Sequence, residues 1–517
     1  MKLNYRRTIF VGFAFFLICT FWQAYDTIIP KILTDKFGMN QAYSGIIMAL
    51  DNILALFMLP LFGAISDRCR SRLGRRTPFI LIGTIAASVL LIALSFADGM
   101  QLRNISAVSA VDDPQALSVL YDAEKDVPLQ TPENETFILG DLMTRDEFTA
   151  IRSETVNAET GKKTASEAYV RYVVPARQHY AQQATAANPR ALILFIVILL
   201  LLLIAMAVFR SPAVALMPDV TVKPLRSKGN AVINLMGTAG GILVLGLGIV
   251  FATGAARNAL MSYTVFFIVI AGIMLLSLAV FRLKVDEPRF VREMEEEERK
   301  HGLREEKEDD GSGSRHLSAA ERRSLLLILG SVVFWFMGYN AVTSKYSVYA
   351  GKVLSRDYNT TLMIANVAAI ISYLPVGHLA SRIGRKKTIL IGIACLACAF
   401  AAAAFLREGS SAMLMNAMFA LAGIGWATIN VNSFPMVVEL SRGSDVGRYT
   451  GFYYTASMAA QTVTPYLSGL LMDRAGMTTL FPYAAVFVCL SAVTMLFVRH
   501  GDSRPVQPDS VLERLDG

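Results

Sequence analysis

The chain has 517 residues, of which 54% are hydrophobic and only 17% are charged, and its formal net charge is +8. A chain this long and this apolar is unlike a single soluble core and predicts a polytopic membrane protein. The positive charge does not indicate a nucleic-acid partner, because the basic residues lie in short loops between apolar runs, where membrane topology explains them. The five cysteines lie in apolar runs or in one loop, and they predict neither a disulfide framework nor a metal site.

Apolar runs of the roughly 20 residues that a bilayer requires recur along the whole chain. They start near Thr8, Gln41, Pro78, Ala191, Gly229, Met261, Ser324, Asn359, Thr388, Ala412, Val446 and Thr479. These runs predict an all-α membrane protein with twelve transmembrane helices, the first of them a retained helix rather than a signal peptide. The bias of Lys and Arg among the short loops places both termini in the cytoplasm. We expect the protein in the plasma membrane, or in the inner membrane if its source is bacterial.

Polar segments divide the predicted helices into groups. Residues 98–190 form a long extracytoplasmic insertion, which is either a small cap domain or a loosely ordered loop. Residues 286–323 are rich in charge and end in a Gly-Ser stretch, which is typical of a cytosolic linker. The expected membrane parts are then 1–97 with 191–285, and 324–500, followed by a cytosolic tail at 501–517.

The two membrane parts show weak internal similarity. At an offset of 314 residues, matching residue types recur at Tyr25 and Tyr339, Asn52 and Asn366, and Gly63 and Gly377. The motif ILIG at residue 80 also recurs at residue 389, after five residues are lost. We therefore expect two pseudo-symmetric six-helix bundles.

An Arg-dense hairpin, GAISDRCRSRLGRRTP from Gly63 to Pro78, separates the second and third runs. It resembles the loop 2-3 signature of the major facilitator superfamily, and RSRLGRRTPFILIG resembles the glycoside-pentoside-hexuronide:cation symporters and the sucrose-transporter-like families. The resemblance implies the major facilitator fold and a gating role for Gly63, Asp67, Arg68, Arg72, Gly74, Arg75 and Arg76. It also implies that Asp67 latches the outward-facing state against the start of span 11, near Asp445.

Asp51 is the carboxylate that lies deepest in a predicted span, beside Asn52. A charge in hydrocarbon costs several kcal/mol unless it is paired or wetted, so such residues are functional candidates. An apolar surrounding favours the neutral form of a carboxyl group, as a proton carrier requires. The alternative is that Asp51 and Asn52 only hold neighbouring helices together.

Asp26 lies in the outer third of span 1, near Trp22 and Gln23. Aromatic faces stack on the C–H faces of sugars while carboxylates and amides bind the hydroxyls, although a carboxylate near a helix end can also simply reach toward water. The repeat places Asn340 opposite Asp26. Lys345 follows in span 7 and either neutralises Asp26 across the cavity or lies at the interface.

Arg210 begins RSPAVALMPD, which resembles a segment of the sucrose-transporter-like group in which an arginine is implicated in substrate handling. The arginine lies at the inner interface if the span ends there, and faces the cavity if Pro212 only kinks a longer helix. Amides that suit a neutral polyol complete the candidate set: Asn366, Asn430, Asn432 and Gln461.

The sodium-coupled glycoside symporters carry two carboxylates in span 2, and Ala55 and Leu59 stand at those positions here. We therefore expect protons rather than sodium as the coupling ion, with no other cofactor. The hypothesis is a monomeric, lipid-embedded secondary transporter that moves a small polar solute, a sugar such as a disaccharide or glycoside, by alternating access. Proton-driven efflux of a drug-like solute, or a non-transporting receptor that uses the insertion, are the alternatives. An enzyme is disfavoured, since no catalytic constellation stands at useful spacing.

Overall fold

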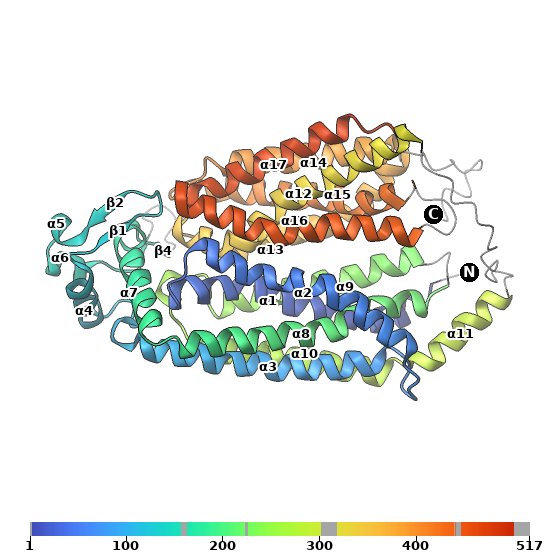
Figure 1. The fold of residues 1–517 in the computed structure, drawn as a ribbon, viewed down its shortest axis with the longest axis horizontal. Coiled ribbons are helices and arrows are strands. Elements are labelled where there is room, and N and C mark those ends of the chain that lie inside the picture. The colour runs from blue at the N-terminus through green and yellow to red at the C-terminus, as the bar shows by residue number, and fades with distance from the viewer. Residues whose placement is uncertain are drawn as a thin grey trace.

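The computed structural model describes residues 3–156, 163–222, 226–300, 318–438, 440 and 446–500. Long helices run side by side along the long axis of the molecule, and a smaller unit covers one end. The start of α1 (Tyr5–Lys31) and the end of α17 (Leu480–Leu496) lie toward the other end (Figure 1). We call these the insertion end and the terminal end. The predicted tail at 501–517 and residues 301–317 of the predicted linker lie outside the described residues.

The long helices form two bundles, each around its own hydrophobic core, as the internal repeat predicts. The N-terminal bundle consists of α1 (Tyr5–Lys31), α2 (Gln41–Arg68), α3 (Thr77–Asn104), α8 (Arg190–Asp219), α9 (Arg226–Val250) and α10 (Thr264–Lys284). The C-terminal bundle consists of α12 (Ala319–Lys352), α13 (Tyr358–Ile383), α14 (Arg385–Ala403), α15 (Ala412–Val438), α16 (Val446–Ala475) and α17 (Leu480–Leu496). The bundles meet where α2 packs on α16, α9 on α13 and α1 on α12.

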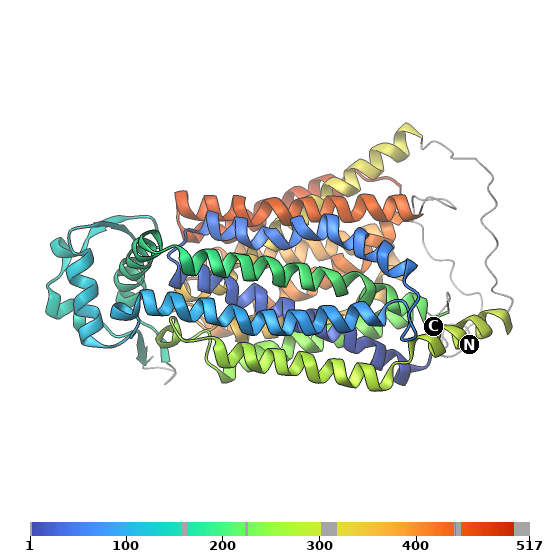
Figure 2. The same cartoon turned by 60° about the horizontal axis from the view of Figure 1, so that its bottom comes forward.

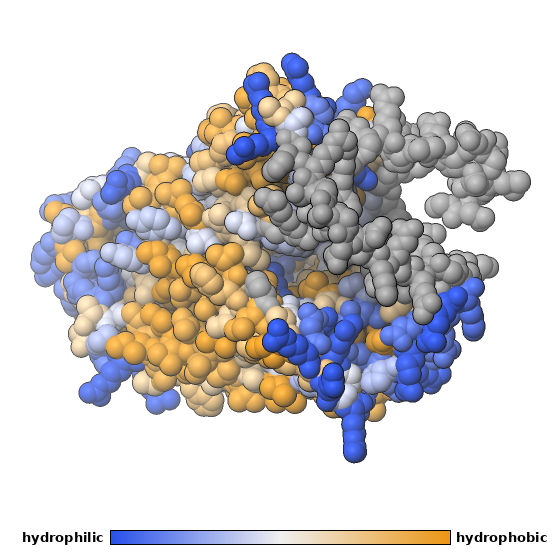
Figure 3. All heavy atoms as spheres, turned by 45° about the vertical axis from the view of Figure 1, so that its right-hand side comes forward, coloured by the Kyte–Doolittle hydropathy of each residue, from blue (hydrophilic) through white to orange (hydrophobic). Residues whose placement is uncertain are grey.

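Within the described residues, ten helices are long and apolar enough to cross a membrane. The long helices α13 and α16 are not among these ten, and they complete the two sets of six. Figure 3 shows the matching surface, with apolar side chains over the flank of the bundles and hydrophilic ones toward the ends. Length, composition and surface together describe a multi-pass membrane protein.

The segment between α3 and α8 folds around a third hydrophobic core, which includes Leu117, Phe148 and Tyr169. We call residues 105–189 the insertion. It contains α4 (Pro114–Glu124), α5 (Leu139–Leu142), α6 (Arg145–Ala150) and α7 (Val174–Ala187), with two antiparallel hairpins, β1 (Pro128–Gln130) with β2 (Thr136–Ile138) and β3 (Glu154–Val156) with β4 (Lys163–Ala165). Its helices cover the insertion end of the bundles (Figure 2).

The Arg-dense hairpin is held by a carboxylate from α11 (Glu287–Lys300). Glu287 is buried and accepts hydrogen bonds from the backbone N–H groups of Arg75, Arg76 and Thr77, at the start of α3. Gly74 precedes them with a φ of +105°, and a β-carbon there would collide with the Glu287 carboxylate. The glycine is therefore needed both for the turn and for the close approach of α11.

A buried ion pair fixes the N-terminal bundle at the insertion end. The Lys36 ammonium donates to both oxygens of Asp98, at 2.6 and 2.8 Å, and to the Met261 carbonyl at 2.8 Å. Both side chains are 0% exposed. Because the pair joins the end of α1 to α3 and to the start of α10, its loss would leave a charge buried without a partner.

Replacing one partner of this pair should therefore destabilise the protein strongly. We expect Lys36→Met or Asp98→Asn to lower the free energy of unfolding by about 3 to 5 kcal/mol, and the double variant Lys36→Met/Asp98→Leu to recover part of that loss. The free energy of unfolding of each variant would be measured in detergent. Asp122→Asn, which removes one side of the exposed Arg145–Asp122 pair, is the control and should change little. Equal losses in the single and double variants would contradict the coupling.

Candidate functional site

Charged side chains from three helices interact electrostatically within the N-terminal bundle. Trp22 and Asp26 lie on α1, Asp51 on α2 and Arg210 on α8, and all four are partly buried. The Arg210 guanidinium lies over the indole ring of Trp22, 5.2 Å from its centroid. Arg210 also interacts electrostatically with Asp26 and Asp51, which repel each other. We call these four residues the central cluster.

The local sequence explains how the cluster assembles. Trp22 and Asp26 are four residues apart, so they lie on the same face of α1 one turn from each other. The sequence left open whether the span ends at Arg210, and in the structure α8 continues through Pro212 to Asp219. Arg210 is therefore a mid-helix residue and not the last residue of the span.

Asp51 has a polar neighbour on its own helix. Its Oδ1 accepts a hydrogen bond of 2.8 Å from the Asn52 amide. Two buried groups on α1 have no hydrogen-bond partner in the described residues. They are the indole N–H of Trp22 and the phenol hydroxyl of Tyr25. Buried polar groups are usually hydrogen-bonded, so these two groups are suited to contact a polar solute.

The C-terminal bundle places aromatic side chains opposite the cluster. The rings of Tyr339 on α12 and Trp426 on α15 stack at 3.7 Å with an angle of 4° between them. Tyr339 also interacts electrostatically with Asp26 across the interface of the bundles. Tyr373 on α13 is hydrogen-bonded to Asn430 on α15. An aromatic platform and an amide thus face two carboxylates and an arginine.

Another amide pair joins the bundles beside the cluster. The Asn366 amide on α13 donates to the Gln23 side-chain oxygen on α1, at 3.5 Å. The sequence predicted both residues as binding candidates, and Asn366 and Asn52 as equivalents in the two halves. The structure gives these amides different partners, since Asn52 binds Asp51 within its own helix.

Other predicted residues have local or distant partners. Asn340 donates to the Phe336 carbonyl and Asn432 to the Thr428 carbonyl, each within its own helix. Gln461 lies on α16 and is partly buried. Lys345 does not pair with Asp26, because its buried ammonium donates to the Gln41 carbonyl at 2.5 Å and faces Asp473.

The predicted gating residues form a network inside the N-terminal bundle. Arg76 pairs with Asp67, and it also pairs with Asp219 at the end of α8 at 2.8 Å. Arg75 reaches the same Asp219 carboxylate at 3.1 Å. The Gly63 carbonyl accepts from Ser66 at 2.8 Å, while Arg68 and Arg72 are exposed. The expected latch partner Asp445 lies outside the described residues, and here the Asp67 carboxylate is bound by Arg76.

The sequence reasoning missed Tyr339 and Tyr373 as site residues. The sequence did contain an indication for Tyr339, because this residue matches Tyr25 in the internal repeat and precedes the candidate Asn340. The sequence contained no such indication for Tyr373, because its role depends on the packing of α13 against α15.

The fold and the cluster define a membrane protein of two six-helix bundles with a charged centre. The family model of the Major Facilitator Superfamily matches residues 183–434 and 355–514, and the model "MFS/sugar transport protein" matches residues 10–105. The chain therefore belongs to the major facilitator superfamily. The predicted fold class and the predicted family are confirmed.

Curated relatives match over short segments only. "Sucrose transport protein SUC4" of Arabidopsis thaliana is 37% identical over 62 residues, 12% of each chain. "Proton-associated sugar transporter A" of Homo sapiens is 36% identical over 84 residues, 16% of this chain and 11% of the relative. Thus this chain covers only about an eighth of these relatives.

Solved structures match over the whole chain at low identity. The inward open conformation of the xylose transporter XylE from E. coli has a TM-score of 0.59 at 14% identity, covering 99% of both chains. A D-xylose-proton symporter has a TM-score of 0.55 at 15% identity, covering 96% of this chain and 99% of that one. These similarities support the fold.

The contact between Arg210 and Trp22 can be tested by fluorescence. Trp22, Trp335 and Trp426 are the three tryptophans of the chain. In a Trp335→Phe/Trp426→Phe background, Arg210→Gln should change the emission intensity of Trp22, because it removes the positive charge over the indole ring. The cation–π contact that is lost contributes about 0.5 to 2 kcal/mol. Arg103→Gln, an exposed arginine near the insertion end, is the control. Identical spectra for both variants would argue against this contact.

Proposed function

We propose that this protein is a secondary active transporter that moves a sugar together with protons by alternating access. The observation that carries the proposal is the central cluster, in which two carboxylates share one arginine opposite an aromatic platform. Its polar and charged character favours a small polar solute over a drug-like one, since efflux pockets are mostly apolar and aromatic.

The cluster offers the groups that a sugar requires. The faces of Trp22 and of the Tyr339–Trp426 stack suit the C–H faces of a sugar ring. The Asp26 carboxylate, the Gln23 amide and the free Trp22 N–H suit its hydroxyls. Because these groups come from both bundles, a bound sugar would bridge the two moving parts.

Coupling to protons follows from the charge balance. Arg210 can neutralise one carboxylate at a time, so the second carboxylate is left with an uncompensated charge in a site surrounded by apolar helices. Protonation of that carboxylate removes the charge and therefore the free-energy cost of holding it inside the membrane. Asp26 and Asp51 are therefore the proposed proton carriers, and Arg210 alternates between them when a proton leaves.

Alternating access needs a closed end, and the insertion end supplies the contacts for it. Asp473 at the end of α16 accepts from the backbone N–H groups of Gln41 and Ala42 at the start of α2, at 2.8 and 2.7 Å. Thr253 after α9 is hydrogen-bonded to Tyr358 and Asn359 of α13. We propose that the insertion end faces the outside, with both termini in the cytoplasm.

Uptake into proteoliposomes tests the proposal. We expect the wild type to accumulate at least one labelled mono- or disaccharide under an imposed proton gradient, and an uncoupler to abolish this. Asp26→Asn and Asp51→Asn should lose accumulation, because a neutral amide can neither bind nor release the coupling proton. Asp141→Asn, an exposed carboxylate of the insertion, should behave as the wild type.

A wild type that accumulates no sugar with either direction of the gradient would overturn the sugar proposal. Accumulation that survives both central substitutions would instead overturn the assignment of the proton carriers.

A further inference from the structure

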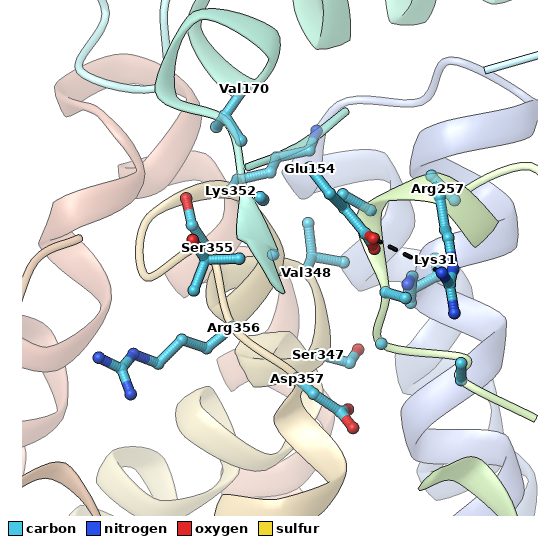
Figure 4. A pocket seen from close by; sticks show the side chains of 18 of the residues that line it. Lys31, Glu154, Val170, Arg257, Ser347, Val348, Lys352, Ser355, Arg356 and Asp357 are labelled. Carbon is cyan, nitrogen blue, oxygen red and sulfur yellow. Dashed lines mark ion pairs between the residues drawn. The ribbon is translucent and has the colours of Figure 1, made fainter. Parts of the chain in front are cut away.

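Another candidate site, with charged side chains in its lining, lies at the insertion end, away from the central cluster. It is a cavity of about 390 Å³ bounded by three parts of the molecule. The insertion contributes β3, β4 and α7, the N-terminal bundle contributes the end of α1 and the connection from α9 to α10, and the C-terminal bundle contributes the junction of α12 and α13 (Figure 4). The predicted solute site does not include it.

Basic side chains outnumber acidic ones in the lining. The basic residues are Lys31, Lys163, Arg177, Arg257, Lys352 and Arg356, and the acidic residues are Asp35, Glu154 and Asp357. Arg356 points away from the others in Figure 4 and donates to the Ser410 carbonyl, so we leave it out of the argument. The remaining basic groups come from all three parts.

In the described residues, Lys31 and Lys352 donate hydrogen bonds to neutral groups. The Lys31 ammonium donates to the Thr253 carbonyl at 2.7 Å, and the Lys352 ammonium donates to the side-chain oxygen of Gln178 at 2.8 Å. Arg257 approaches Glu154 only to 3.9 Å. Each of these cations therefore keeps unused capacity to donate to a charged acceptor.

The other polar groups of the lining are consistent with a ligand. Asp357 is occupied by capping α13, since its Oδ1 accepts from the backbone and the side chain of Asn359. The Ser347 hydroxyl is buried and has no partner in the described part of the chain. Figure 4 shows Ser347 and Asp357 on one wall, with Lys31 and Arg257 facing them.

We propose that this cavity binds a small organic anion, a hydroxylated compound that carries a carboxylate or a phosphate. Charge-assisted hydrogen bonds from Lys31, Arg257 and Lys352 hold the oxyanion, and the Ser347 hydroxyl contacts a hydroxyl group. The anion adds negative charge near Lys31 and Lys352, which repel each other and have Asp35 as a shared acidic neighbour.

The position of the cavity gives the anion a regulatory effect. The insertion already contacts the C-terminal bundle here, because the Ala165 N–H donates to the Ser355 carbonyl at 3.3 Å and Gln178 accepts from Lys352. A ligand held by all three parts binds best when they are together. It therefore shifts the population toward the state in which the insertion end is closed.

Binding to the full-length protein in detergent, at constant ionic strength, tests the proposal with glucuronate, inorganic phosphate and neutral glucose as probes. We expect at least one of the two anions to bind, and Arg257→Gln and Lys352→Gln each to weaken that anion's affinity about tenfold. Lys125→Gln makes the same charge change on the insertion outside the cavity and should have no effect. Arg257→Lys should restore part of the affinity, which separates lost charge from misfolding.

Asp26→Asn and Asp51→Asn distinguish this cavity from the central cluster. Anion binding that is unchanged in both variants supports a separate site, even if no sugar is transported. The proposal is overturned if neither anion binds the wild type, if Arg257→Gln and Lys352→Gln bind as the wild type does, or if the central substitutions abolish binding.

Discussion

The electrostatic balance of Arg210 against two carboxylates is the constraint on which the rest of the membrane part depends. A charge among apolar helices is tolerated only when it is paired or wetted. Asp26, Asp51 and Arg210 come from α1, α2 and α8, so compensation requires these helices to meet at one depth. The long apolar run of α8, with Pro212 inside it, is what carries the arginine to that depth.

Properties local to one helix were predictable from the sequence. The length of the apolar runs predicted the membrane helices. The recurrence of residues such as Tyr25 and Tyr339 at one offset predicted two bundles, because a duplicated unit keeps its spacing. Asp26, Asp51 and Arg210 were recognisable for the same reason, since a charge inside an apolar run is conspicuous whatever its partner. Their proximity to one another was not visible until the helices were packed.

Partners across helices were not predictable. Lys345 is equally placed in the sequence to reach Asp26 or the interface. Only the packing of α12 on α16, which itself packs on α2, assigns it to the Gln41 carbonyl. The Tyr339–Trp426 stack joins two helices far apart in the chain. The insertion is a harder case, because its core is assembled from short elements whose apolar residues are too sparse to show a period.

The chain connectivity of the insertion has a consequence for molecular recognition. Both of its ends are joined to helices of the N-terminal bundle, α3 and α8. Its Asn134 nevertheless donates to the Arg474 carbonyl, and its Pro132 carbonyl accepts from Met477, between α16 and α17 of the C-terminal bundle. The surface along that seam is therefore a composite epitope that exists only while the two halves touch. An antibody fragment raised against it would recognise one conformation of the protein and not the other.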